Sequence, residues 1–261
     1  MEQILAAPQT FTNAWGWTDL DLGPKGEYLT YRALEGVKGR KRFLFNCYIP
    51  IKTGYWSEID LIMLHRSGVY VFECKNYSGW ISGSEADEYW TQKFQNGHTG
   101  DFKSPIIQNK SHIRWLRRFL PKLSEKAVYS VIVFGERCEL ERITLTTGRH
   151  IVVKSDRLLN AIRPTLGRRM LTRREIRRLY QRLYPQTQLT PQEKQRHRDN
   201  VQAIKEGRLC PWCYSEMVPR TARNTGHQFM GCKSFPACKY TAKLPSECLE
   251  RQPCDHLCFP Y

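Results

Sequence analysis

The chain has 261 residues, 41% of them hydrophobic, which is enough to bury the core of one medium domain and a small module. Its formal net charge of +16 favours a polyanionic partner. Nucleic acid is the first candidate, and an anionic membrane surface is the competing one. Because no run of about 18 apolar residues is present, the sequence excludes a membrane-spanning helix and we expect no membrane insertion.

The N-terminal residues, Met-Glu-Gln-Ile-Leu, lack the basic and apolar regions of a secretory signal. The chain has ten cysteines, and seven of them fall between Cys210 and Cys258. Disulfide frameworks belong mainly to short secreted chains, so metal binding explains this cluster better. We therefore expect a cytoplasmic protein.

The first half of the chain predicts one α/β unit. Residues 26–34 predict a helix, and residues 42–49 (RFLFNCYI) predict a strand. Residues 58–64 and 69–75 are two apolar runs on either side of a short turn at Arg66-Ser67-Gly68, which is the pattern of a hairpin.

Two further elements follow the hairpin. Ser104 and Pro105 predict the start of a helix, with serine as the N-cap and proline at the first helical position. Residues 129–134 (YSVIVF) form the short apolar run that is typical of a buried strand.

The composition becomes strongly basic after residue 148. Residues 149–208 hold 16 Lys or Arg against 5 Asp or Glu, which gives +11 of the total charge. Residues 172–184 predict an amphipathic helix with an arginine face. Pro185 and Pro191 then predict a break in the chain and a linker.

Three charged residues of the hairpin suggest a catalytic site. Side chains alternate along a strand, so Glu73 and Lys75 share a face while Cys74 points away. The hairpin would bring Asp60 back alongside them. Two carboxylates and an ammonium would then meet at the end of an otherwise apolar hairpin.

This grouping suits hydrolysis of a phosphodiester bond. Asp60 and Glu73 could hold Mg²⁺ or Mn²⁺, hard cations that prefer oxygen ligands. Such a metal lowers the pKa of a bound water and shields charge on the phosphate. Lys75 could orient or deprotonate that water and oppose the negative charge of the transition state.

The block Asp60…Glu73-Cys74-Lys75 has the pattern of PD-(D/E)xK nucleases, and residues 22–140 resemble the nuclease-related domain (NERD) family. The segments that carry the resemblance are 26–27, 58–60, 73–81 and 104–109. It implies an α/β fold of the restriction-endonuclease type, in which helices flank a mixed sheet. Asp60 is not preceded by the proline of the superfamily name.

The resemblance also implies roles for individual residues. Asp60 and Glu73 would be metal ligands, Lys75 would be the catalytic lysine, and Glu27 would be a first-helix acid that assists the metal. Gln108 would orient the site from the later helix. His112, four residues after Gln108 on the same helix face, could join the site.

Four cysteines near the C-terminus have the spacing of a structural zinc site: Cys210, Cys213, Cys232 and Cys238, in the pattern C-x2-C-x18-C-x5-C. Two thiolate pairs on two knuckles would complete a tetrahedral shell around Zn²⁺ and leave no position open for chemistry.

Residues 208–243 resemble the C-terminal zinc ribbon of type IA DNA topoisomerases, because the spacing and the intervening residues agree together. The resemblance implies binding of single-stranded DNA. Aromatic side chains that could stack on bases are Trp212, Phe229, Phe235 and Tyr240, although some could instead fill the small core of the ribbon. Basic side chains that could meet phosphates are Arg220, Arg223, Lys233 and Lys239.

The sequence thus predicts four segments. They are a nuclease-related domain at 22–148, a basic helical segment and linker at 149–207, a small β zinc ribbon at 208–243, and a cysteine-containing tail at 244–261. In the tail, Cys248, Cys254, His256 and Cys258 fit no zinc module by spacing, so a second metal site and a poorly ordered tail both stay open.

We interpret the whole as a metal-dependent DNA nuclease with a DNA-binding ribbon. One alternative is a DNA-binding scaffold without catalysis. The other is an enzyme or binder directed at RNA, which neither domain excludes.

Overall fold

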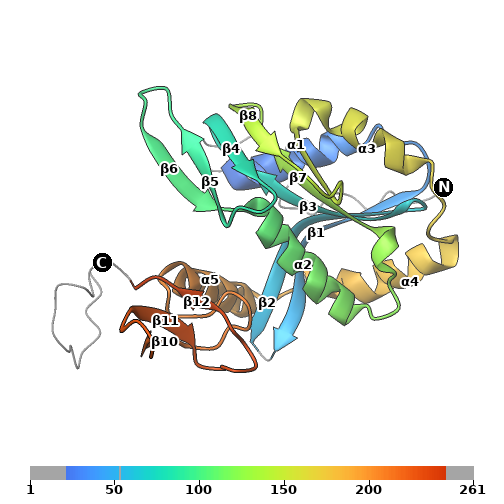
Figure 1. Cartoon of the computed structure of the whole chain (residues 1–261). Helices are drawn as coiled ribbons and strands as arrows, with labels where there is room; N and C mark the ends of the chain where they lie inside the picture. Colours follow the sequence, from blue (N-terminus) through green and yellow to red (C-terminus); the bar gives the residue numbers. More distant parts are fainter. Residues whose placement is uncertain (1–21, 53, 245–261) are drawn as a thin grey trace. The chain divides into compact units, whose positions relative to one another are not determined.

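The structure is a computed structural model that describes residues 22–52 and 54–244. The described residues divide into two compact units, one of residues 22–50 with 56–189 and one of residues 51–52 and 54–55 with 190–244. The boundary after Leu189 falls between Pro185 and Pro191, the two prolines at which a break is predicted. Figure 1 shows the elements of each unit.

The first unit is built on a five-stranded mixed sheet in the order β1-β2-β3-β7-β9. The strands are β1 (Lys41–Lys52), β2 (Tyr55–His65), β3 (Gly68–Lys75), β7 (Val128–Phe134) and β9 (His150–Lys154). Strands β2 and β3 are antiparallel, as the predicted hairpin requires, whereas β3, β7 and β9 run parallel.

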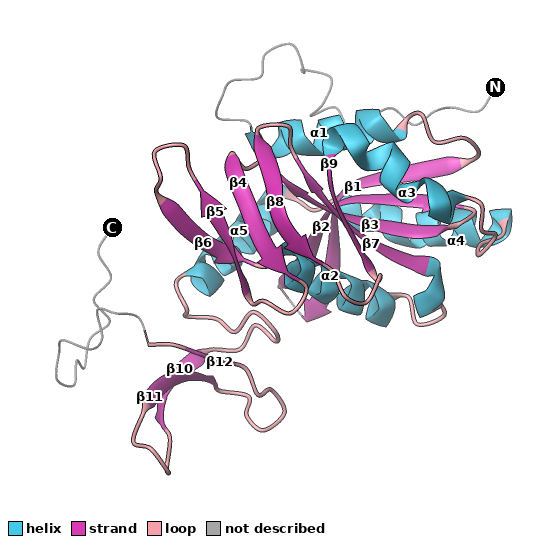
Figure 2. Cartoon of the chain, turned by 45° about the horizontal axis from the view of Figure 1, so that its top comes forward, coloured by secondary structure: helices cyan, strands magenta, loops and turns pink. Residues whose placement is uncertain are grey.

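Helices cover both faces of this sheet (Figure 2). They are α1 (Leu22–Leu34), α2 (Pro105–Phe119) and α3 (Leu158–Leu166). Side chains of β7 alternate between the faces: Val131 and Val133 pack with Leu34 of α1, while Ile132 packs with Ile106 of α2. The predicted mixed sheet flanked by helices is therefore confirmed.

The turn between β2 and β3 needs a glycine. Gly68 has φ +148°, and a Cβ at this position would stand 2.5 Å from the Ala127 carbonyl oxygen. The side chain of any larger residue would clash with the backbone at Ala127. The turn thus keeps the hairpin in the register that opposes Leu61 to Phe72.

Helix α2 begins at Pro105, as predicted. Ser104 is the N-cap residue, as predicted, but its hydroxyl is buried and makes no capping hydrogen bond. The helix start instead rests on the proline and on the Ser104 carbonyl, which accepts the Gln108 N–H at 3.1 Å.

A second sheet, which the sequence patterns above do not predict, lies in the order β6-β5-β4-β8. Its strands are β4 (Gly79–Ser84), β5 (Tyr89–Lys93), β6 (Thr99–Lys103) and β8 (Cys138–Thr144). Ile81 and Trp90 face inward and pack on Ile106 of α2. Strands β4, β5 and β6 pair with their neighbours in the chain, whereas β8 joins the sheet by pairing with β4, which lies about 60 residues earlier.

The basic segment does not begin where the sequence changes composition. Strand β9 follows residue 148, yet it pairs with β7 across residues 130–134 and belongs to the main sheet. Helix α4 (Arg173–Leu183) also lies in the first unit, and its predicted helix is confirmed, with a capping box between Thr172 and Glu175. The compact unit therefore extends well beyond the boundary predicted at residue 148.

The second unit contains α5 (Pro191–Lys205) and a three-stranded antiparallel sheet. Its strands are β10 (Met217–Thr221), β11 (Gln228–Cys232) and β12 (Thr241–Ala242). Pro191 opens α5, with Thr190 and Glu193 forming a capping box. The linker predicted at Pro191 is thus the first turn of a helix.

A buried acid, Glu85, accepts hydrogen bonds from the turn between β8 and β9. Its carboxylate is 8% exposed and accepts hydrogen bonds from the Thr147 hydroxyl at 2.5 Å and from the Thr147 and Thr146 N–H groups. These bonds lower the pKa of Glu85 from 4.5 to about 2.

A depressed carboxyl pKa contributes stability above pH 4.5 that is lost as the pH falls towards 2. We expect Glu85→Gln to be less stable than the wild type at neutral pH and to lose less stability over that range. Chemical denaturation from pH 7 to pH 2 checks this, with Glu88→Gln on the exposed turn as the control. Parallel pH profiles for wild type and Glu85→Gln would refute it.

Candidate active site and zinc ribbon

The predicted catalytic residues meet where β2 and β3 separate. The antiparallel pairing ends at Leu61 and Phe72, and two residues further on the Cys74 N–H donates to Asp60 Oδ2 at 2.8 Å. Asp60 therefore occupies the place of a backbone acceptor. The separation of the strands leaves its carboxylate beside Glu73, whose charge acts on it.

Glu73 and Lys75 lie on the face of β3 that is covered by α2. Glu73 is 1% exposed, and its Oε1 lies 2.6 Å from Lys75 Nζ. Lys75 Nζ also donates to Gln108 Oε1 at 3.0 Å, which brings Gln108 of α2 into contact with the site. Two anchors thus hold the ammonium in one position.

His112 completes the network one turn further along α2. Its Nε2 lies 3.2 Å from Glu73 Oε2, and its Nδ1 shares a hydrogen bond of 2.6 Å with the Ser57 hydroxyl. The contact with Glu73 lacks hydrogen-bond geometry, so Glu73 Oε2 is left without such a partner among the described residues. This buried oxygen keeps a lone pair for a further ligand.

Like charges crowd the site. Burial, then Glu58 and Glu73, raise the pKa of Glu27 to about 8. Burial, then Glu73 and Glu27, raise the pKa of Asp60 well above its ordinary range, although the Cys74 N–H opposes this. The cluster therefore holds more carboxylates than it can keep ionised without a cation.

Lys75 and Glu73 compensate each other within this cluster. Burial would raise the pKa of Glu73, but Lys75 and His112 outweigh it and the pKa is lowered. Burial would likewise lower the pKa of Lys75, but Glu73 outweighs it and the pKa is raised. The Lys75 side chain therefore stays protonated at neutral pH.

These residues fit a hard divalent cation. The donors are carboxylate oxygens, one of them on Glu73 is buried without a hydrogen bond, and two acids carry raised pKa values that a cation would lower. Asp60 and Glu73 would hold the ion, with Glu27 beside them.

The structure adds Glu58 and Ser57 to the predicted residues. It also places His112 in contact with the cluster. Glu58 lies two residues before Asp60, and its alternation with Asp60 along β2 would place both on one face. Ser57 has no signal in the sequence, because its contact with His112 joins residues 55 positions apart.

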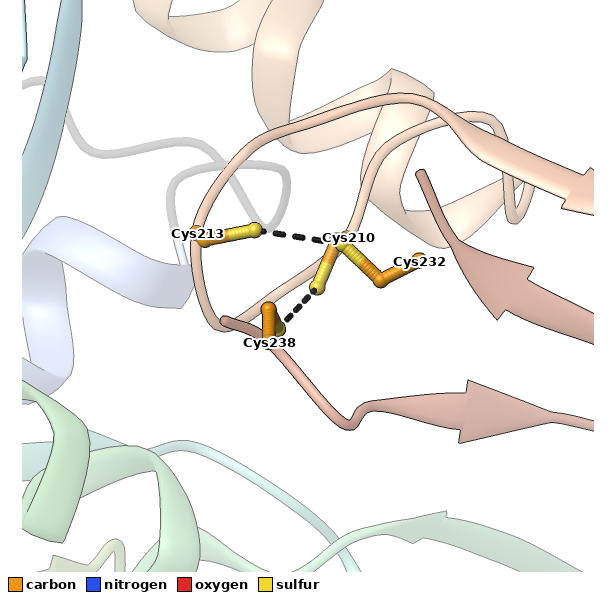
Figure 3. A group of neighbouring side chains, drawn as sticks. All are labelled: Cys210, Cys213, Cys232 and Cys238. Carbon is orange, nitrogen blue, oxygen red and sulfur yellow. Dashed lines mark hydrogen bonds between the residues drawn. The ribbon is translucent and has the colours of Figure 1, made fainter. Parts of the chain in front are cut away.

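The four predicted zinc ligands converge in the second unit, as Figure 3 shows. Their Sγ atoms all lie within 4.8 Å of one another. Cys210 and Cys238 are 3.7 Å apart, and Cys213 and Cys232 are 3.3 Å apart. Four thiols at this spacing match a closed tetrahedral zinc shell.

Some of the ribbon side chains that are predicted to contact nucleic acid are exposed. Trp212 and Phe235 are 44% and 59% exposed, whereas Phe229 and Tyr240 are half-buried. Arg220 lies over the Phe235 ring at 5.6 Å, and Tyr240 lies 5.3 Å from Trp212.

Three of the basic side chains that are predicted to meet phosphates are exposed: Arg223, Lys233 and Lys239. Lys233 pairs with Glu216 at 2.9 Å. The tail residues Cys248, Cys254, His256 and Cys258 lie outside the described residues. No helix in residues 22–52 or 54–244 has the length and apolar character needed to cross a bilayer.

Comparison with protein families supports both resemblances. Residues 22–135 match the family model of the nuclease-related domain, NERD. Residues 207–247 match the model of the topoisomerase DNA-binding C4 zinc finger. The chain is thus similar to a nuclease-related domain in its first part and to a topoisomerase-type zinc ribbon in its last.

One relative is an uncharacterized protein from Bacillus anthracis, 30% identical over 136 residues. The match covers 51% of this chain and 63% of that protein's length. No solved structure matches the chain.

Proposed function

We propose that the protein is a metal-dependent nuclease that hydrolyses phosphodiester bonds of DNA, and that its ribbon binds DNA in single-stranded form. The observation that carries the proposal is the group of carboxylates around Lys75. Burying several acids together costs stability, and a scaffold would have no use for them.

Asp60 and Glu73 would hold Mg²⁺ or Mn²⁺, which when bound makes water a nucleophile at neutral pH. The other roles belong to side chains. Glu73 and Gln108 orient the Lys75 ammonium by two contacts of 2.6 and 3.0 Å. Because the raised pKa keeps Lys75 protonated, it would stabilise the growing negative charge of the phosphate and would not remove a proton from water.

Glu27 would serve as the local proton acceptor. Its pKa of about 8 means that it holds a proton over most of the neutral range in the absence of a cation. Neutralisation of the neighbouring carboxylates would lower that pKa and free Glu27 to accept a proton. His112 and Ser57 would keep Glu73 in place.

Purified protein incubated with labelled single-stranded DNA, duplex DNA and RNA, with Mg²⁺ or with chelator, tests the proposal. Metal-dependent cleavage of DNA supports it. Cleavage of RNA alone would favour the RNA-directed alternative, and binding without any cleavage would favour the scaffold. Four thiolates persist best in a reducing compartment, which supports a place in the cytoplasm.

DNA would also meet exposed arginines on α4. In this helix Arg173, Arg174, Arg177, Arg178 and Arg182 are exposed, and the only acid, Glu175, is engaged in the capping box. Arg182 also reaches α2, where its guanidinium lies over the Phe119 ring at 4.9 Å. Phosphate contacts from such a surface are independent of sequence.

We therefore expect affinity for DNA to fall steeply with salt. Each phosphate contact contributes a slope of about −0.7 on single strands or about −0.9 on duplex DNA. The double variant Arg174→Gln with Arg178→Gln should reduce the slope by about 1.5. Fluorescence anisotropy between low and physiological salt measures it.

Arg142→Gln is the matched control, because Arg142 is exposed on β8 in the same unit. It should leave the slope nearly unchanged. Equal slopes for the α4 double variant and the wild type would remove α4 from the DNA-binding surface.

A further inference from the structure

A cavity of about 150 Å³ lies in the first unit beside the acidic cluster. It opens at the carboxyl ends of β3, β7 and β9, on the face that α1 covers, and the turn before α3 closes one wall. Open α/β sheets bind ligands outside the carboxyl ends of parallel strands. None of the acids Glu27, Glu58, Asp60 and Glu73 lines the cavity, but Lys75 does, so the cavity adjoins the cluster.

Ser155 lines this cavity and carries a hydroxyl without a hydrogen-bond partner among the described residues. The residue is 8% exposed, and its Oγ is buried without a hydrogen bond to any described residue. An unpaired buried hydroxyl destabilises the folded chain, so such groups usually serve a ligand or a bound water.

Arg137 stands at the same cavity with unused donors. Its Nη2 donates to the Asn76 carbonyl oxygen at 3.0 Å, which anchors the guanidinium. No carboxylate forms an ion pair with Arg137 among the described residues. The one acid in the lining, Glu136, is exposed on the turn between β7 and β8.

On the opposite wall of the cavity, the Cys74 thiol and the Thr30 hydroxyl already have hydrogen-bond partners. The Cys74 thiol donates to the Thr30 hydroxyl at 3.4 Å, and that hydroxyl donates to the Gly26 carbonyl oxygen at 2.9 Å. Gly135, also in the lining, allows Asn76 to approach closely, since a Cβ there would stand 2.8 Å from Asn76 Oδ1. Among the lining side chains, Ser155 Oγ has no hydrogen-bond partner in the described residues, and Arg137 has N–H groups beyond the one that Asn76 accepts.

A hydroxyl and a guanidinium with free N–H groups are donors to an anion, and a phosphate is the anion for which arginine geometry is best suited. We propose that the cavity holds a phosphate of the bound DNA strand, next to the one that is cleaved. This rests on the proposed function, since DNA supplies the phosphate. Gly26 and Lys75, which line the cavity, adjoin the cluster through Glu27 and the Glu73 contact.

The test measures binding and not cleavage, so it stands apart from the test of nuclease activity. Full-length Asp60→Asn protein in chelator is titrated with dTMP and with thymidine by calorimetry. We expect dTMP to bind at least about tenfold more tightly, the usual effect of one charge-assisted hydrogen bond. Equal affinity for the two would overturn the proposal.

Two substitutions locate the site. Arg137→Gln and Ser155→Ala should each weaken dTMP about tenfold. The controls Arg142→Gln and Ser124→Ala change exposed residues outside the lining and should bind as the parent does. Unchanged dTMP affinity in both cavity variants would refute the assignment.

Thermal unfolding separates ligand binding from a structural role for Ser155. Removing an unpaired buried hydroxyl should leave the Tm equal or higher while affinity falls. A lower Tm with unchanged affinity would show a purely structural serine.

Competition identifies the source of the phosphate. An oligonucleotide should displace dTMP, and its own affinity should fall more in Arg137→Gln than in Arg142→Gln. If inorganic phosphate displaces dTMP and the oligonucleotide does not, the cavity is a free-anion site and the DNA assignment is wrong.

Discussion

Replacement of Asp60 by asparagine is expected to reduce DNA cleavage about a thousandfold or more, because a metal contributes several kcal/mol to such a reaction. The substitution is conservative in shape, and the amide oxygen can still accept the Cys74 N–H that Asp60 Oδ2 accepts at 2.8 Å. The local strand geometry should therefore persist while the charge is lost. Single-turnover cleavage in Mg²⁺ measures the effect.

The same variant should be more stable than the wild type without metal. A carboxyl whose pKa is raised on folding destabilises the folded chain once the pH rises above the ordinary pKa of the group, which is 3.8 for Asp60. Asp60 therefore destabilises the protein at pH 8. Asp60→Asn removes that cost and raises the Tm in chelator. Conversely, Mg²⁺ should raise the Tm of the wild type much more than that of the variant.

Affinity for DNA should change little in Asp60→Asn, because the basic surface on α4 is distinct from the acidic cluster. Asp101→Asn is the matched control, since Asp101 is an exposed acid on β6 that bonds only the Thr91 hydroxyl in this sheet. Full cleavage by Asp60→Asn would contradict the assignment of Asp60 to the metal site. Loss of cleavage in both variants would point to a general defect of the protein.

The second large effect concerns the ribbon. Cys213→Ser should release the zinc, unfold the module and lower the affinity for single-stranded DNA. A ribbon of about 35 residues has too little core to fold alone, and metal binding supplies about 10–16 kcal/mol in zinc-finger peptides. Its small core consists mainly of the ligands themselves, with Met217.

Elemental analysis and DNA binding measure this prediction. The wild type should hold one zinc per chain, whereas near two would implicate the tail residues Cys248, Cys254, His256 and Cys258. Cys138→Ser is the control, because Cys138 is buried in the first unit and should leave the zinc content unchanged. Cleavage by Cys213→Ser should persist at high enzyme concentration, since the acidic cluster lies in the other compact unit.

A Cys213→Ser protein that folds and binds single-stranded DNA normally would overturn the assignment of the ribbon to DNA binding. Loss of all cleavage at every enzyme concentration would instead show that the ribbon is needed for the chemistry.

Local patterns in the sequence determined the hairpin, the segments of α2, β7 and α4, and the cysteine cluster. Two-residue alternation and a short turn are enough to oppose Asp60 and Glu73, because a hairpin joins neighbours in the chain. Cysteine spacing is likewise local on each knuckle. The resemblances to the nuclease-related domain and to the topoisomerase ribbon rest on these same short blocks.

Only the tertiary structure decided the rest, since it depends on residues far apart in the chain. The five residues of β9 look like part of a basic linker until they pair with β7. Ser57 gains meaning only through His112, 55 positions later, and the Ser155 cavity forms where three parallel strands end. Pairing and burial between distant segments leave no period or spacing in the sequence, and these decide which polar groups stay unsatisfied and free to bind.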